Sequence, residues 1–439
     1  MSKFGKISGF PEWLPDQKLI ENRVFESIRA IYEQYGYTPI ETAAVEPLAV
    51  LSAKGVIDKE IYALKRARDT EGGGGGEAEL GLHFDLSVPL ARYVAQNFGN
   101  LTFPFKRYQC QKVWRGDRPQ KGRFREFYQF DIDVIAQDDL PLSCDAEILS
   151  AYTAALAATG AGKFTVKLNN RKILIGFFES LGLSPEQQNS ARIIVDKILK
   201  IRASGVKAEL ETGMGLDSKT ADKIVQFAEQ SFKPGDAKAK LESLGVSNPT
   251  FETGVAELLE LLKLADTKIL PQLLIDLSLA RGLDYYTGAV FEAYLDDHSE
   301  FGSVGSGGRY DNLTSQFINK KLPGVGVSIG VTRLMDLILS ENLIPATRKT
   351  VTKALITVLS EEQRPLCNQT AGKLRSLGVP TEVYFKSPKI GKQIEYAEKK
   401  GITCVLFIQP DGAVEAKDLK TKEQRPVTDF AALAQQLKD

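Results

Sequence analysis

The sequence predicts an α+β protein made of more than one domain, and three observations support this. Residues 105–135 alternate apolar and polar side chains on both sides of a basic turn, which is typical of a half-buried antiparallel β-hairpin. Residues 183–264 form amphipathic helical patches with no strand signal, whereas residues 350–439 alternate strands and helices. A chain of 439 residues is long enough for about two or three such domains.

Composition excludes several classes of protein. The 56 basic and 56 acidic residues cancel, so any contact with nucleic acid must come from local patches. No apolar run of about 20 residues and no signal-peptide pattern is seen, which predicts a cytoplasmic chain with no membrane contact. Four scattered cysteines, without a CxxC pair, argue against a zinc site and a disulfide framework.

The N-terminal part predicts a helix, a short strand and a hairpin. Residues 16–36 carry apolar side chains at helical spacing. Pro39 interrupts the strand predicted at 37–45, which suggests an edge or an interface. Residues 60–65 and 79–84 form a predicted hairpin with five consecutive glycines, 72–76, in its tip. No Gly-Lys-Ser/Thr follows these glycines, so we interpret them as a linker and not as a phosphate-binding loop.

The segment HFDLSVP, residues 83–89, is a candidate for binding a cation. Asp85 and Ser87 stand two apart and share one face of an extended segment, which suits an ammonium group. An aspartate just before a helix is also a common cap, and residues 90–97 are predicted to be helical. His83 and His298 are the only histidines, which argues against a histidine triad or a multi-histidine metal site.

The turn of the predicted hairpin is strongly basic. Six Lys or Arg residues lie between Lys112 and Arg125, against one acid, Asp117. Taken alone, such a turn is more often simply solvated than a polyanion-binding site, and only the rest of the chain can favour the second interpretation.

The remaining elements are expected in a regular order along the chain. Residues 324–334 resemble a strand that runs into a helix, with glycines where a close approach is needed. The C-terminal residues 350–439 have 14 basic and 11 acidic residues, and five of the lysines fall within 386–400. The other predicted elements are a helix at 144–159, strands at 164–168, 273–277 and 289–295, and, in the C-terminal part, strands at 354–359, 381–385 and 403–408 with helices ending at 377, spanning 390–399 and beginning at 430.

These stretches together resemble the histidyl-tRNA synthetases, a family of class II aminoacyl-tRNA synthetases. The segments ARGLDYYTG (280–288) and GGRYD (307–311) resemble hallmarks of that family. The first helix with 37–47, the hairpin and 324–334 resemble the three class II motifs. The resemblance implies an antiparallel sheet flanked by helices and a dimer. It also implies four segments: a catalytic core at 1–180, a helical insertion at 181–266, the core continued at 267–345, and an anticodon-binding α/β domain at 350–439.

The resemblance implies a reaction and its partners. The enzyme would activate L-histidine with ATP, release pyrophosphate, and transfer histidine to the 3′ end of tRNA(His). Magnesium would arrive with ATP and not in a protein cage. The partners implied are ATP, L-histidine, tRNA(His) and a second copy of the chain, as a homodimer.

Site residues follow from the same resemblance. Arg115 and Arg281 would be catalytic, because each would contact the α-phosphate that the histidine carboxylate attacks. The residues implied to bind ATP are Arg115, Arg123, Phe127, Arg281 and Arg333. Those implied to bind histidine are Asp85, Ser87, Gln129, Asp133, Tyr286 and Tyr310. Those implied to meet the acceptor end of tRNA are Arg118, Gln120 and Lys121.

Two alternatives compete with this interpretation. One is a synthetase-like regulatory subunit of ATP phosphoribosyltransferase, which would bind ligands without catalysis; retention of the C-terminal module and of the three arginines Arg115, Arg281 and Arg333 argues against it. The other is a different class II synthetase, which the two hallmark segments disfavour. The sequence also departs from the family pattern, most clearly at Thr332, which replaces an acid before Arg333.

Overall fold

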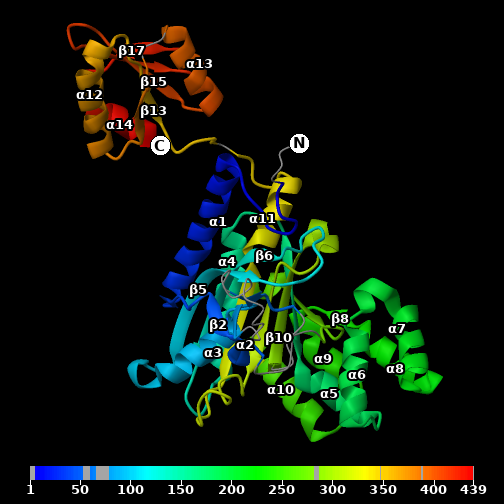
Figure 1. Ribbon diagram of the computed structural model, residues 1–439. Coiled ribbons are helices and arrows are strands. Elements are labelled where there is room, and N and C mark those ends of the chain that lie inside the picture. Colours follow the sequence, from blue (N-terminus) through cyan, green and yellow to red (C-terminus); the bar gives the residue numbers. More distant parts are fainter. Residues whose placement is uncertain are drawn as a thin grey trace. The chain divides into compact units, whose positions relative to one another are not determined.

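The structure is a computed structural model, shown in Figure 1. The packing of the chain divides it into two units. The Gly-rich tip at 72–76 and residues 281–285, which include Arg281, lie outside the described residues. The structure describes residues 5–52, 60–65, 79–280, 286–346, 348–386 and 389–438. The first unit contains Met1–Pro11 and Val24–Ile344, and the second contains Glu12–Arg23 and Pro345–Asp439.

The first unit is built around one large sheet. Its strands follow the order β1-β5-β6-β12-β11-β10-β7-β9-β8, nine strands among the described residues. All neighbouring pairs are antiparallel except β1 with β5 and β7 with β9, which confirms the predicted antiparallel core. The bounds are β1 Thr38–Pro39, β5 Phe105–Trp114, β6 Glu126–Ile135, β12 Gly324–Gly330, β11 Gly305–Tyr310, β10 Tyr286–Leu295, β7 Phe164–Asn170, β9 Leu273–Asp276 and β8 Ser231–Phe232.

The predicted hairpin is strands β5 and β6, paired from Phe105 with Ile135 to Trp114 with Glu126. One face of β6 packs its apolar side chains against α1 (Pro15–Gln34), where the ring centroids of Tyr32 and Phe130 are 5.4 Å apart. The expectation that the pair is only half-buried is wrong for β6. Its polar face is also buried, since Gln129, Asp131 and Asp133 are at most 9% exposed.

The strand predicted at 37–45 is two short strands in different sheets. Pro39 ends β1, which pairs with β5 at the edge of the large sheet, as the missing N–H of proline requires. Strand β2 (Val45–Pro47) joins a small sheet in the order β2-β4-β3. That sheet contains the predicted hairpin, because β3 (Ala63–Leu64) and β4 (Leu80–Leu82) pair antiparallel.

Helices account for most of residues 183–264, as predicted, but one short strand there was not expected. Strand β8 is only two residues long and pairs with β9, so its sequence carries little pattern. Helix α10 packs against α4 and α5. Gly176 and Gly254 allow the close contact of α5 with α10, because a Cβ at Gly176 would lie 2.4 Å from the backbone nitrogen of Phe251.

The helices of the first unit surround its sheet and extend to one side (Figure 1). Their bounds are α1 Pro15–Gln34, α2 Leu48–Leu51, α3 Ser87–Gln96, η2 Phe98–Asn100, α4 Leu142–Ala158, α5 Arg171–Ser180, α6 Pro185–Val195, α7 Ile198–Met214, α8 Ser218–Ala228, η3 Pro234–Asp236, α9 Ala237–Glu242, α10 Pro249–Leu264, η4 Thr267–Gln272, η5 Asp296–Phe301 and α11 Val331–Ser340. None of the helices in the described ranges is long and apolar enough to cross a membrane.

The second unit has its own sheet and its own apolar core, as the alternating pattern predicts. The sheet order is β14-β13-β15-β16-β17, with parallel pairs around β13 and antiparallel pairs after β15. Strands β16 and β17 were not predicted. The bounds are β13 Ala354–Ile356, η6 Glu361–Gln363, α12 Arg364–Ser376, β14 Thr381–Val383, α13 Ile390–Lys400, β15 Cys404–Ile408, β16 Val414–Asp418, β17 Gln424–Pro426 and α14 Phe430–Lys438.

Candidate active site

A cavity of about 380 Å³ opens over the polar face of the large sheet. Its walls come from four central strands (β6, β10, β11 and β12), from the β5–β6 loop, from α11 and from the segment that leads into α3. Elements that are far apart in the sequence therefore meet at one site.

The floor of the cavity is a row of polar side chains on neighbouring strands. Asp131 on β6 pairs in register with Ser328 on β12, which pairs with Ser306 on β11. Ser306 in turn pairs with Glu292 on β10. Directly paired residues point to the same face of a sheet, and all four line the cavity. The floor therefore carries a carboxylate at each end and two hydroxyls between them.

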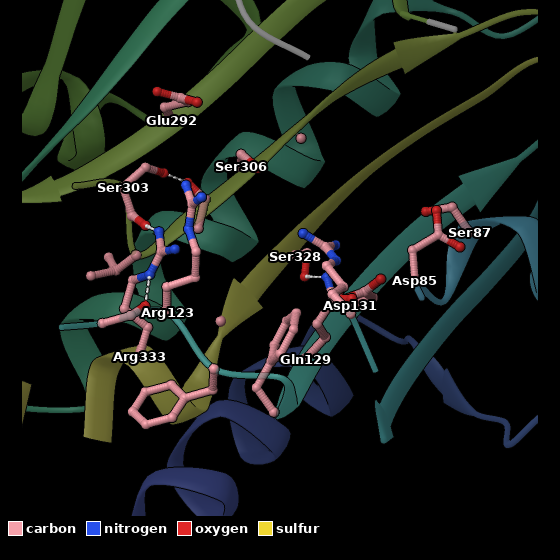
Figure 2. Close-up of a pocket in the computed structure, with 18 of the residues that line it drawn as sticks. Asp85, Ser87, Arg123, Gln129, Asp131, Glu292, Ser303, Ser306, Ser328 and Arg333 are labelled. Atoms are coloured by element: carbon pink, nitrogen blue, oxygen red, sulfur yellow. Dashed lines mark hydrogen bonds between the residues drawn. The ribbon is translucent and has the colours of Figure 1, made fainter. Parts of the chain in front are cut away.

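One end of the cavity is acidic. Figure 2 shows Asp85, Ser87, Gln129 and Asp131 close together there. The amide nitrogen Nε2 of Gln129 donates to Oγ of Ser328 at 2.7 Å, and the Ser328 hydroxyl is hydrogen-bonded to the Asp131 carboxylate. Burial raises the pKa of Asp131 to about 7, although the nearby Arg107 opposes this. Burial also raises the pKa of Asp85. This end suits a cationic group.

The other end is cationic. Figure 2 shows Arg123 and Arg333 beside Ser303. The Arg333 guanidinium donates to the carbonyl oxygen of Gly122 at 2.6 Å and to that of Ser303. Arg115 also lines the cavity but lies near Asp85, at the acidic end; its Nε donates to the carbonyl oxygen of Phe84 at 3.0 Å. Guanidinium groups held by backbone carbonyls suit the binding of phosphoryl groups.

Two predicted histidine-binding residues lie behind the cavity. The hydroxyl of Tyr310 donates to Oδ1 of Asp133 at 2.7 Å, and Arg107 forms an ion pair with Oδ2 at 2.6 Å. Neither Asp133 nor Tyr310 lines the cavity. Gly326 leaves room for this pair, because a Cβ there would lie 1.9 Å from Oδ1 of Asp133.

Arg118, Gln120 and Lys121 are the residues predicted to meet tRNA. They lie on the β5–β6 loop but, unlike other residues of that loop, do not line the cavity. The backbones of Gln120 and Arg123 hydrogen-bond to each other in both directions, which closes the loop into a tight turn. The ammonium of Lys121 lies 3.9 Å from the ring centroid of Phe301 and 3.6 Å from the Glu341 carboxylate. The loop tip is thus tied to η5 and to the end of α11.

The structure brings most predicted site residues together, but not all of them. Arg118, Gln120, Lys121, Asp133 and Tyr310 stand outside the walls, and Arg281 is not described. The predicted residues that line the cavity are Asp85, Ser87, Arg115, Arg123, Phe127, Gln129, Tyr286 and Arg333.

Several polar residues of the cavity walls were not predicted from the sequence. Asp131 had a usable signal, because it alternates with Gln129 and Asp133 on one face of a predicted strand. The serines and Glu292 had none, because only the register of the sheet brings them to the cavity. The polar wall residues that were missed are Asp117, Asp131, Glu292, Ser303, Ser306 and Ser328.

Comparison with known proteins shows the family to which the chain is related. A family model described as histidyl-tRNA synthetase matches residues 9–334, and an anticodon binding domain model matches residues 353–438. The histidine–tRNA ligase of Thermobifida fusca is 46% identical over 422 residues, which cover 95% of each chain.

Solved structures give the same relationship. The crystal structure of histidyl-tRNA synthetase from Nostoc sp. PCC 7120 is 37% identical, with a TM-score of 0.87, and the match covers 100% of this chain and 99% of that one. A Bacillus halodurans structure described as an ATP phosphoribosyltransferase regulatory subunit/histidyl-tRNA synthetase has a TM-score of 0.75 over 93% of this chain and 98% of that one. At 19% identity, that second likeness shows the fold alone. By sequence and by fold over its whole length, the chain belongs to the histidyl-tRNA synthetase family.

Proposed function

We propose that the chain is an ATP-dependent histidine–tRNA ligase and that the cavity over the large sheet is where histidine is activated. Family membership supports the reaction. The observation that carries the assignment of the site is one cavity that holds both carboxylates and arginines. Asp85 and Asp131 lie toward one end, with Arg115 near Asp85, whereas Arg123 and Arg333 lie toward the other end. An amino acid and a nucleoside triphosphate bound end to end require this arrangement.

The arginine end would bind ATP. A carboxylate oxygen of histidine attacks the α-phosphorus, the bond to the β-phosphate oxygen breaks, and pyrophosphate leaves. Arg115 would hold both the attacking carboxylate and the α-phosphate, with Arg281 as the second α-phosphate contact, because fixed donors stabilise the charge that develops there. Arg123 would contact the γ-phosphate, and Phe127 and Arg333 would enclose the adenine.

The acidic end would bind histidine. Asp85, Ser87 and Gln129 would accept or orient the α-ammonium, and Tyr286, which also lines the cavity, would contact the imidazole. Asp133 and Tyr310 would recognise the imidazole from behind the wall, with their mutual hydrogen bond fixing both side chains. Buried polar groups of this kind discriminate strongly against side chains that leave them unpaired.

Magnesium would come with ATP. Its usual protein partners are one or two carboxylates, the remaining positions being taken by phosphates and water. Glu292 lines the cavity and meets that requirement, with its Oε2 accepting a hydrogen bond from Tyr294. The ion would neutralise phosphate charge; the arginines described above orient the phosphates.

The tRNA and dimer assignments extend this proposal. Arg118, Gln120 and Lys121 would meet the acceptor end, and the C-terminal unit would bind the anticodon. A homodimer would form through the segment around β2, where Val45, Leu64 and Leu80 expose apolar surface on the small sheet. With tRNA and ATP as substrates, we place the enzyme in the cytoplasm.

The test is amino-acid-dependent exchange of pyrophosphate into ATP, followed by charging of tRNA(His). We expect exchange with L-histidine and none above background with the other amino acids tried singly. Exchange with another amino acid would assign a different class II synthetase. An absence of exchange with all of them, with histidine still bound, would favour a regulatory protein.

A further inference from the structure

Three buried acceptor atoms in the acidic end have no hydrogen-bond partner among the residues that the structure describes. They are Oδ2 of Asp85, Oε1 of Gln129 and Oδ1 of Asp131. All three side chains line the cavity and are at most 9% exposed. Buried acceptors normally have partners, and an –NH₃⁺ group has three N–H donors. The number and type of unused acceptors match one ammonium ion.

The charges around Asp131 show why it needs a cation from outside the protein. Arg107 is fully buried and its charge acts on both Asp131 and Asp133, but its ion pair is with Asp133. The hydroxyl of Tyr310 also binds Asp133, so both oxygens of that carboxylate are engaged. Asp131 receives a hydrogen bond from Ser328 and no ion pair within the described ranges. A buried carboxylate in this situation favours a cationic ligand.

Hydrogen bonds connect the side chains of Gln129, Ser328 and Asp131. Gln129 donates its amide N–H to Oγ of Ser328, while its own carbonyl oxygen Oε1 is buried and has no partner among the described residues. The same serine holds the Asp131 carboxylate through its hydroxyl. Gln129, Ser328 and Asp131 are thus connected by hydrogen bonds, and Figure 2 shows Asp85 beside Asp131.

We propose that Asp131 is a substrate-binding residue whose Oδ1 accepts an N–H from the α-ammonium of histidine, beside Asp85 and Gln129. The inference rests on the proposed function, because it names a further contact in the same site. The two carboxylates of β6 then have different roles. Asp131 binds the α-ammonium of the substrate, whereas Asp133 is neutralised by Arg107 and does not bind that group.

The experiment compares Asp131→Asn with the wild type in histidine-dependent pyrophosphate exchange. The amide keeps the size of the side chain but removes its charge and turns one acceptor into a donor. Loss of one partner in a buried charge pair costs about 2–5 kcal/mol, so KM for L-histidine should rise by about 30-fold or more. KM for ATP should stay within about twofold. Asp138→Asn is the matched control, because Asp138 is exposed just beyond β6 at φ 65°, which asparagine tolerates.

A second readout identifies the group that Asp131 contacts. Imidazolepropionate is histidine without the ammonium, and calorimetry should show that the wild type binds it far more weakly than L-histidine. In Asp131→Asn this preference should shrink by about the same factor as KM rises. We expect the same changes in KM and in ligand preference for Asp131→Ser, which replaces the amide variant in the experiment if Asp131→Asn does not fold.

The outcomes separate the inference from the proposed function. An unchanged KM for histidine, or an unchanged preference over imidazolepropionate, would overturn the role of Asp131. Failure of the wild type and Asp138→Asn to exchange with histidine would instead contradict the proposed function.

Discussion

At the scale of single residues, the buried carboxylate of Asp131 should lower the stability of the folded chain at neutral pH. Its pKa is raised from 3.8 to about 7 in the fold, so between these pH values the folded state binds more protons than the unfolded state. Stability contributed by this group is therefore present below pH 4 and is lost as the pH rises to about 7. The groups around it are Arg107, Asp133, Asp85 and the Ser328 hydroxyl.

Asp131→Asn should remove this pH dependence. We expect the variant to be more stable than the wild type at pH 8, by about 2–4 kcal/mol, and nearly equal to it at pH 4. Thermal unfolding across pH 4–8 measures this difference in stability. The control variant Asp138→Asn should have the same pH dependence of stability as the wild type. A variant less stable than the wild type at pH 8 would mean that Asp131 is paired in the fold.

The sequence predicted the residues that belong to recognisable segments, and the cavity contains eight of them. It could not predict that Asp133 is neutralised, because Arg107 on β5 meets it only through the register of the hairpin. Nor could it predict Ser306 or Glu292, whose positions depend on pairing between strands that are far apart in the chain. Side-chain periodicity shows on which face of a strand a residue lies, but it does not show which strand pairs beside it.

At the scale of elements, helix α11 holds the β5–β6 loop over the cavity. Arg333 donates to the carbonyl of Gly122, and the carboxylate of Asp336 accepts the N–H of the same glycine at 3.1 Å. Thr332, which stands where the family usually has an acid, accepts the backbone N–H of Tyr128 at 2.8 Å. A hydroxyl is sufficient for that contact, so the departure from the family pattern has a structural role.

Gln120→Ala should separate the two steps of the reaction. The turn that contains Gln120 is closed by backbone atoms, so loss of its exposed side chain leaves the loop and the cavity unchanged. We expect transfer to tRNA(His) to slow by about tenfold, the effect of losing about 1.4 kcal/mol, while pyrophosphate exchange stays within twofold. Equal losses in exchange and in single-turnover transfer would remove Gln120 from the tRNA contact.

Elements with a long periodic pattern were predicted well, and short ones were not. The ten-residue strands β5 and β6 and the helices α4 and α13 lie within a few residues of their predicted bounds. Strands β8 and β17 are two and three residues long, and β11 is rich in glycine, so each has too little side-chain pattern to be recognised.

At the scale of the whole molecule, the two units have separate apolar cores, which suits a division of labour between catalysis and tRNA binding. The C-terminal unit presents an aromatic side chain in its basic segment: Phe385 is 65% exposed, with the Lys386 ammonium 5.7 Å from its ring centroid. An exposed aromatic ring beside a cation is a common platform for an unpaired base.

Phe385→Ala should therefore weaken tRNA binding without touching the activation of histidine. Stacking of one base on an aromatic side chain is worth about 1–3 kcal/mol, so KM for tRNA(His) should rise by about 5- to 100-fold. Pyrophosphate exchange should be unchanged, because the cavity and its arginines lie in the first unit. Val351→Ala is the matched control, since that side chain is 61% exposed in the same unit but has no ring. If both variants raise KM for tRNA equally, the effect is general to apolar surface and base stacking on Phe385 is contradicted.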